Sequence, residues 1–317
     1  MARVRGRIRT EPLIAFGVPV YGGALIPTVG QDWFVDPNAD VFVPKKAAGT
    51  GKSDDRPFST LAEALAACNT SDRIFIHGNI REEGLICSNL KFDVHVIGVG
   101  GTHHPDQPSS AYHPGAACIR PPASPTAATD LLEVRGRGWE FHNILFDAPV
   151  DAAAVKLVRN ASSGTSEYDG GHARFRGCRF ESGLVGIEND GGAAFVRVKD
   201  CQFYRMSGSG AAGIKCTSTS VAVPLNWRIE DSDWHNNASH ILSSMSYSTI
   251  RRNIFGRFTA TLSVDVYDQP SASQGEYNVI TENYLTGTYD PTAYPAGSNN
   301  EWAGNQNVAG VTTADPT

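Results

Sequence analysis

A six-residue pattern recurs six times between positions 141 and 285, and no other feature of the sequence limits the fold so strongly. Each copy has an apolar residue first, a bend residue third, a small, apolar or amide residue fourth, and an aromatic residue or leucine sixth. The copies span residues 141–146, 175–180, 198–203, 229–234, 250–255 and 280–285, and their starts are 34, 23, 31, 21 and 30 residues apart. A repeat of this length predicts structural units that stack on their neighbours.

The spacing inside each copy predicts two strands joined by a bend. Positions four and six have the period-2 spacing of one strand face, whereas positions one and four are three residues apart, so the backbone must turn between them. Four of the six third-position residues are Asn, Gly or Asp, which tolerate left-handed backbone at low cost. We therefore expect one coil per repeat, with successive coils stacked in parallel about 4.8 Å apart.

Stacked coils place equivalent side chains in columns. The sixth position predicts a column of aromatic rings that ends at Leu285, and the fourth position predicts a second column that ends with Asn253 and Asn283, hydrogen-bonded along the stack. The predicted fold is all-β, a right-handed single-stranded parallel β-helix. An antiparallel sandwich or propeller is the alternative, but the chain has no Asn-Gly hairpin turn.

The chain divides into an extended basic arm at residues 1–30, a lead-in at 31–72 and the β-helix body at 73–317. Within the lead-in, Thr60 and Glu63 have the spacing of a capping box, followed by Leu61, Ala64 and Leu65 on one helix face, so a short capping helix is expected. The longer repeats carry inserted loops, predicted at 162–171, 217–224 and 268–275, all at one corner of the stack.

Charge and cysteine content exclude several classes of function. The net charge is −6, and the first thirty residues alone carry +3, so the remaining body is acidic and unsuited to nucleic acid. Six scattered cysteines without paired metal-ligand spacing are expected to be reduced. No metal or other cofactor is predicted, because His103, His104 and His113 have no carboxylate at ligand spacing. No apolar run is long enough for a membrane span, and prolines and glycines interrupt the only segment resembling a signal peptide.

The Gly- and Asp-rich stretch 49–61, the helix after it and the apolar run 73–78 resemble the opening of pectin-lyase-like β-helix proteins. Among these, bacteriophage tail spikes and other virion appendages look most similar, and they imply a homotrimer attached through an N-terminal segment. The resemblance thus implies a virion structural protein, a capsid decoration or tail-associated spike, made in the host cytoplasm and contacting other virion proteins. A glycan-cleaving tail spike, polysaccharide lyase or glycoside hydrolase is the first alternative, and a secreted bacterial adhesin is the second.

Candidate functional residues fall into three groups. The anchoring arm carries alternating arginines, which share one side of an extended chain: Arg3, Arg5, Arg7 and Arg9. Cleavage of a glycan needs two nearby carboxylates, for which Asp200 with Asp231, or Glu188 with Asp190, are candidates, although the first pair also suits bends whose charges are offset by Lys199 and Arg252. Contact with a cell-surface glycan or a second subunit is expected from Tyr168, Asp169, Tyr267 and Asp268.

Overall fold

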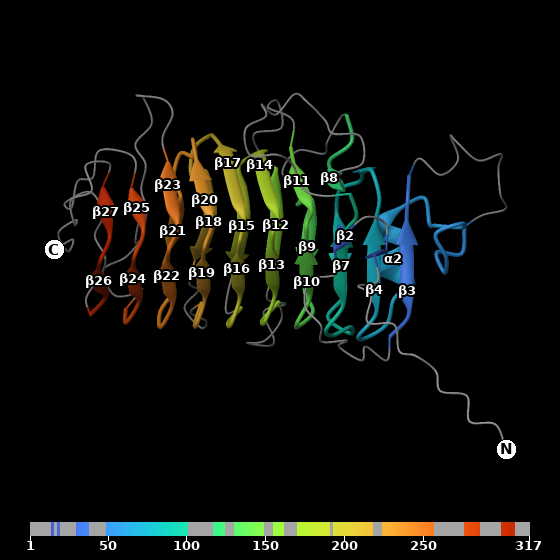
Figure 1. Ribbon diagram of the computed structural model, residues 1–317, viewed down its shortest axis with the longest axis horizontal. Coiled ribbons are helices and arrows are strands. Elements are labelled where there is room, and N and C mark those ends of the chain that lie inside the picture. Colours follow the sequence, from blue (N-terminus) through green and yellow to red (C-terminus); the bar gives the residue numbers. More distant parts are fainter. Residues whose placement is uncertain are drawn as a thin grey trace, which may run out of the picture.

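The computed structural model describes residues 14–15, 18–19, 30–37, 49–100, 117–123, 130–148, 155–161, 170–190, 193–217, 224–256, 276–285 and 299–307. These residues form three parallel sheets, one short helix and a two-stranded antiparallel pair, β1 (Ile14–Ala15) with β2 (Val18–Pro19). Strands of the three sheets succeed one another along one axis in sequence order (Figure 1). The chain is a right-handed single-stranded parallel β-helix, as the repeat predicted.

Each complete coil contributes one strand to each sheet in turn. The ten-stranded sheet consists of β3 (Asp32–Val35), β4 (Arg73–Ile76), β7 (His95–Gly98), β10 (Glu140–His142), β13 (Arg174–Arg176), β16 (Arg197–Lys199), β19 (Arg228–Glu230), β22 (Thr249–Arg251), β24 (Val279–Thr281) and β26 (Glu301–Ala303). The nine-stranded sheet consists of β5 (Asn79–Arg81), β8 (Cys118–Arg120), β11 (Leu145–Asp147), β14 (Arg179–Gly183), β17 (Gln202–Met206), β20 (Asp233–His235), β23 (Ile254–Gly256), β25 (Tyr284–Leu285) and β27 (Gln306–Asn307). The six-stranded sheet consists of β6 (Leu85–Cys87), β9 (Leu132–Val134), β12 (Lys156–Ala161), β15 (Val185–Asp190), β18 (Ala212–Thr217) and β21 (Ile241–Ser243). The first strand of the stack, β3, lies within the segment 31–72.

The register between coils matches the alignment of the six sequence copies. First-position residues pair along the ten-stranded sheet, from Phe141 to Ile280, and sixth-position residues pair along the nine-stranded sheet, from Phe146 to Leu285. All six third-position residues have a positive φ: Asn143 53°, Gly177 60°, Asp200 53°, Asp231 53°, Arg252 54° and Glu282 58°. The bend thus imposes left-handed backbone even on Arg and Glu, which disfavour it.

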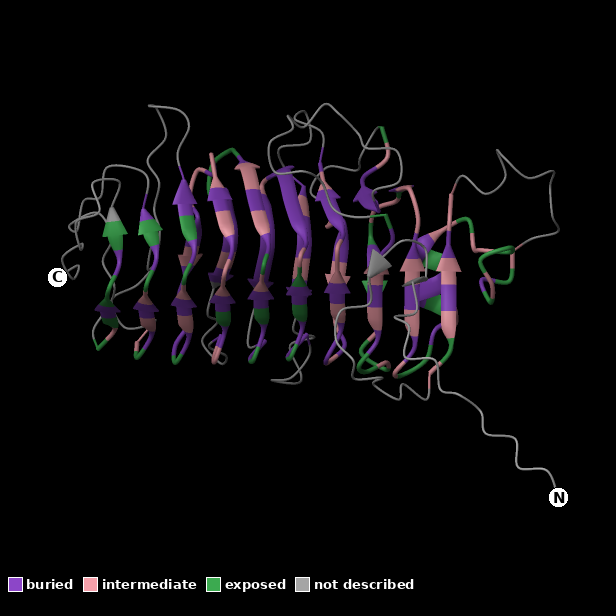
Figure 2. Cartoon of the chain, viewed as in Figure 1, coloured by how far each residue is buried: buried purple, intermediate pink, exposed green. Residues whose placement is uncertain are grey.

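An aromatic column fills the core. Ring centroids on successive coils lie 5.1 Å apart for Phe146 and Phe180, 4.7 Å for Phe180 and Phe203, and 5.5 Å for Trp234 and Phe255. All of these rings are almost completely buried. Figure 2 shows buried residues recurring along the strands of the whole stack.

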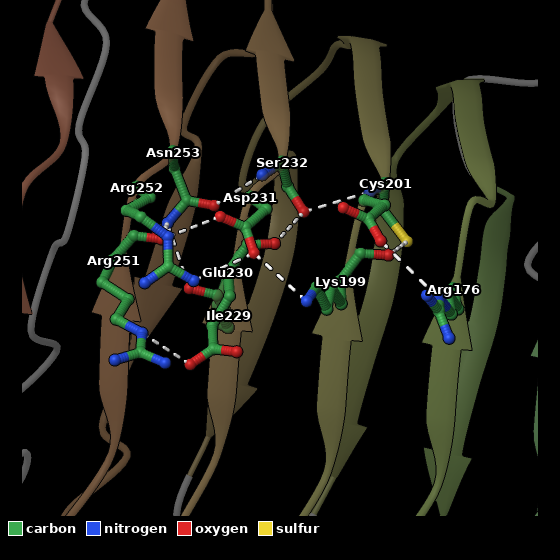
Figure 3. Close-up of polar contacts among 11 residues, drawn as sticks. Arg176, Lys199, Cys201, Ile229, Glu230, Asp231, Ser232, Arg251, Arg252 and Asn253 are labelled. Carbon is green, nitrogen blue, oxygen red and sulfur yellow. Dashed lines mark hydrogen bonds and ion pairs between the residues drawn. The ribbon is translucent and has the colours of Figure 1, made fainter. Parts of the chain in front are cut away.

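A polar ladder runs beside this column at the fourth position. Backbone amides donate to the side chain of the next coil, from Cys201 N to Ser232 Oγ (3.1 Å), Ser232 N to Asn253 Oδ1 (3.1 Å) and Asn253 N to Asn283 Oδ1 (2.9 Å). Figure 3 shows the part of this ladder from Cys201 to Asn253. Asn283 N continues it to Asn305 Oδ1 at 2.9 Å, and Asn253 Nδ2 also donates to Asn283 Oδ1 at 3.1 Å, the bond predicted between these two asparagines.

Helix α2 (Leu61–Ala67) lies at the N-terminal end of the stack, where it contacts β3 and β6 (Figure 1). Thr60 and Glu63 form the predicted capping box, and Leu61, Ala64 and Leu65 are buried. All six cysteines are free and buried. Within the described part of the chain, no helix is long and apolar enough to cross a membrane.

Candidate functional site

The carboxylates of Asp200 and Asp231 occupy successive bends of the stack. Lys199 pairs with Glu230 in the ten-stranded sheet. Asp200 and Asp231 are the residues directly after this pair, so they lie one strand spacing apart. Asp231 accepts hydrogen bonds from Arg252 Nε at 2.7 Å and Nη2 at 3.0 Å, and Lys199 Nζ lies 3.5 Å away (Figure 3). Asp200 Oδ2 lies 3.7 Å from Arg176 Nε.

Asp231 has little capacity to act as an acid. Hydrogen bonds from Arg252 lower the pKa of Asp231, although burial acts in the other direction. A catalytic acid in glycan hydrolysis needs the opposite shift, because it must hold a proton near neutral pH. The geometry therefore favours the structural explanation, in which neighbouring cations offset the charges of two bend residues.

The second predicted pair lies on β15, in the six-stranded sheet. Glu188 faces outward from the sheet and pairs in register with Arg159 on β12 and Lys215 on β18. Its carboxylate forms an ion pair with Lys156 and lies 3.8 Å from Lys215 Nζ. Asp190 ends the same strand, but its side chain lies outside the described residues.

Glu188 belongs to a larger set of charged side chains, which we call the charged cluster: Asp130, Glu133, Lys156, Arg159, Glu188 and Lys215. Its core is one row across the sheet, since Glu133, Arg159, Glu188 and Lys215 pair in register on four consecutive strands. Arg159 Nη1 lies 3.3 Å from Asp130 Oδ2 and 4.0 Å from Glu133 Oε1. Three carboxyl groups and three cations therefore alternate along the outer face of this sheet.

The charged cluster is only partly open to solvent. Exposed fractions run from 8% for the Glu188 side chain to 32% for that of Arg159. Burial raises the pKa of Asp130, although Arg159 and Lys156 act in the opposite direction, and the charge of Glu188 adds to the rise. A carboxyl group with a raised pKa beside a second, ion-paired carboxylate is the arrangement that supplies an acid and a base to one reaction.

Separation between the two carboxyl groups follows from the coil spacing. Asp130 lies two residues before strand β9, and Glu188 lies on β15 with β12 between them, so two spacings of about 4.8 Å separate their backbones, roughly 9.6 Å along the axis. Glu188 is in register with Glu133, so Asp130 also lies three residues further back along the strand direction.

Several sequence predictions lie outside the described residues: the arm arginines, most residues of the corner loops, and Tyr168, Asp169, Tyr267 and Asp268. Of the charged cluster, sequence reasoning identified only Glu188. The other members require the register of the six-stranded sheet, and the six-residue pattern covers only the other two sheets. The signal available in the sequence was the alternation of charged residues in the third strand of each coil, which belongs to the six-stranded sheet.

Comparisons with known proteins agree on the fold. The structure resembles a pectin methylesterase from Aspergillus niger, with a TM-score of 0.51 and 14% identity over 86% of this chain and 90% of that one. Pectin methylesterase from carrot gives 0.48 and 16% over 91% of this chain and 86% of that one, and a rhamnogalacturonan lyase gives 0.48 and 11% over 81% and 68%. No protein-family model matches the chain, and no curated protein matches its sequence. The likeness shows a pectin-lyase-like parallel β-helix.

Proposed function

We propose that the chain is a glycan-active protein that binds a polysaccharide along the outer face of the six-stranded sheet and hydrolyses it at the charged cluster. The observation that carries this proposal is the raised pKa of Asp130 in a partly open cluster that also holds Glu188. A polysaccharide can lie along the stack, because successive strands present their charged side chains at regular intervals.

The two carboxyl groups have different roles in this reaction. Asp130 donates its proton to the glycosidic oxygen as the bond to that oxygen breaks, and Glu188 takes a proton from the water that attacks the sugar carbon. Lys156 and Lys215 hold the Glu188 carboxylate, and Arg159 contacts Asp130.

The test measures reducing ends released from polygalacturonate and from xylan. We expect Asp130→Asn and Glu188→Gln to lower the rate at least about 100-fold, the usual contribution of a positioned acid or base, with polysaccharide binding retained. Asp231→Asn is the matched control, because it removes a carboxylate from the bends and is expected to keep full activity. Unchanged release in Asp130→Asn, or neither binding nor release by the unaltered protein, would overturn the proposal.

Location on a virion is a separate proposal, supported by the arginine alternation of residues 1–30 and the resemblance to phage appendages. Deletion of residues 1–30 is expected to abolish incorporation into particles while circular dichroism still reports a β-helix. Mass photometry of the purified protein tests the proposed trimer. Glycan hydrolysis does not depend on either result.

A further inference from the structure

A histidine–carboxylate cluster lies on the outer face of a different sheet, the ten-stranded one. Glu140 and His142 are two residues apart on β10, so their side chains share one face of the strand. His95 on β7 pairs directly with Glu140 in the parallel ladder. His95 and Glu140 are 45 residues apart in the sequence, and the β-helix brings them together with His142. All three side chains are of types that bind metal ions.

The three ligand atoms converge on one point. Glu140 Oε2 lies 3.4 Å from His95 Nδ1 and 3.2 Å from His142 Nε2, and all three atoms lie within 4.8 Å of one another. The imidazole rings are nearly parallel, with planes 11° apart and centroids 6.0 Å apart. Bonds of about 2.1 Å at tetrahedral angles place ligand atoms about 3.4 Å apart, which two of the three separations already match.

The other oxygen of Glu140 is already occupied. Arg174, which pairs with Glu140 from strand β13, forms an ion pair with Oε1 and so leaves Oε2 directed at the histidines. Outer partners of this kind fix the orientation of a metal-binding carboxylate. The side chains of Glu140 and His95 are 14% and 15% exposed, so a bound ion is largely shielded while solvent still reaches it.

The ligand types of the cluster suit a cation, because neutral imidazole and ionised carboxylate are the forms of these groups that bind metal.

We propose that His95, Glu140 and His142 form a binding site for a divalent transition-metal ion, for which Zn²⁺ is the best match. Two imidazoles and one carboxylate are a ligand set that Zn²⁺ accepts, with one coordination position left for water or an external ligand. Ca²⁺ and Mg²⁺ fit poorly, because they take oxygen ligands. The site lies on a different sheet from the charged cluster and does not depend on the proposed hydrolysis.

The experiment titrates chelator-treated full-length protein with ZnCl₂ in a calorimeter and records absorption spectra with Co²⁺. We expect one ion bound per chain at this site, visible Co²⁺ bands of a four-coordinate complex, and a higher unfolding temperature with Zn²⁺. In the double variant His95→Ala/His142→Ala, affinity at this site is expected to fall by more than about 100-fold, since even outer partners of metal ligands contribute about 10–100-fold.

The control variant His103→Ala/His104→Ala removes two neighbouring histidines of the sequence that have no carboxylate at ligand spacing. It is expected to keep the affinity and the Co²⁺ spectrum of the unaltered protein. Glu140→Gln retains the shape of the third ligand, and we expect it to weaken binding while circular dichroism stays unchanged. Absence of binding by the unaltered protein, or binding that is lost in the control and kept in His95→Ala/His142→Ala, would overturn the proposal.

Discussion

The rings of Phe203 and Trp234 stack on consecutive coils with centroids 4.0 Å apart and planes 7° apart. They are the closest of the stacked pairs along the column, and both residues are fully buried. Their strands, β17 and β20, pair in parallel with these two residues directly opposite. The contact joins two coils near the middle of the stack, so a cavity there disturbs the packing of the coils on both sides.

Phe203→Ala is expected to lower the free energy of unfolding by about 3–5 kcal/mol, because the missing ring leaves a cavity that its stacked neighbours cannot fill. Urea unfolding followed by tryptophan fluorescence measures the loss. Leu90→Ala serves as the control, since this side chain is 79% exposed, and it should change stability by no more than about 0.5 kcal/mol. Similar losses in both variants would show that the aromatic column contributes no more to the free energy of unfolding than an exposed side chain does.

The asparagine ladder yields a second prediction. Asn283 Oδ1 accepts the backbone amide of Asn253 at 2.9 Å in the interior. Asn283→Ala leaves that amide without its acceptor and is expected to cost about 1–3 kcal/mol of unfolding free energy. Asn283→Ser should cost less, because Ser232 holds the equivalent position two coils earlier in the same ladder and its Oγ accepts a hydrogen bond from Cys201 N.

Both variants are compared by urea unfolding, and hydrogen exchange at the Asn253 amide reports the local effect. Faster exchange in Asn283→Ala than in Asn283→Ser is expected. Equal stability and exchange in the two variants would show that the oxygen acceptor is dispensable.

The repeat predicted most of the fold because it encodes register. A one-residue slip would turn every sixth-position ring out of the core, so the ring alignment leaves one register from Phe146 to Leu285. The first coils lack this signal. Val96 on β7 pairs with Phe141, but the coil of Val96 has no aromatic residue at the sixth position. Strand β3 precedes helix α2 in the sequence. Only the three-dimensional pairing adds these strands to the stack.

The functional candidates were harder to predict, because each depends on pairs across strands. Glu188 is visible in the sequence as one acidic residue, but its meaning comes from Lys156, Lys215 and Arg159 on neighbouring strands. Coil lengths vary before the third strand, so spacing alone does not align these residues. The histidine pair His95 and His142 was hidden in the same way by the long insertion between their coils.

Glu82 caps the helix from a distance of about twenty residues. Its carboxylate oxygens accept Leu61 N at 2.7 Å and Ala62 N at 3.0 Å, which are amides of the first helical turn. Glu82→Ala is expected to lower the free energy of unfolding by about 0.5–2 kcal/mol, as loss of a helix cap does. Glu82→Gln keeps an oxygen acceptor and should lose less. Urea unfolding measures both, and an unchanged midpoint in Glu82→Ala would contradict the capping role.

Acid sensitivity is expected from His240. Burial, together with the charge of His235, lowers the pKa of His240 to about 3 from its ordinary 6.5. Its Nδ1 lies 3.2 Å from Asn237 Nδ2, and the ring packs against Phe255 with centroids 5.3 Å apart. The unfolded chain protonates this histidine below about pH 6.5, whereas the folded chain keeps it neutral down to about pH 3. Stability from His240 is therefore fully present above pH 6.5 and is lost as the pH falls toward 3.

His240→Phe should remove this dependence and keep the packing. Between pH 6.5 and 3 the unfolded state binds one more proton than the folded state at this residue, which contributes a slope of up to about 1.4 kcal/mol per pH unit. Urea unfolding at several pH values is expected to give a shallower slope for the variant, with similar stability at pH 8, because Asn237 Nδ2 still donates to Phe203 O at 3.1 Å. Titrating carboxyl groups affect both proteins equally, so the difference between the two curves isolates His240. Parallel curves would mean that the buried ring is already protonated in the folded protein or accessible to water.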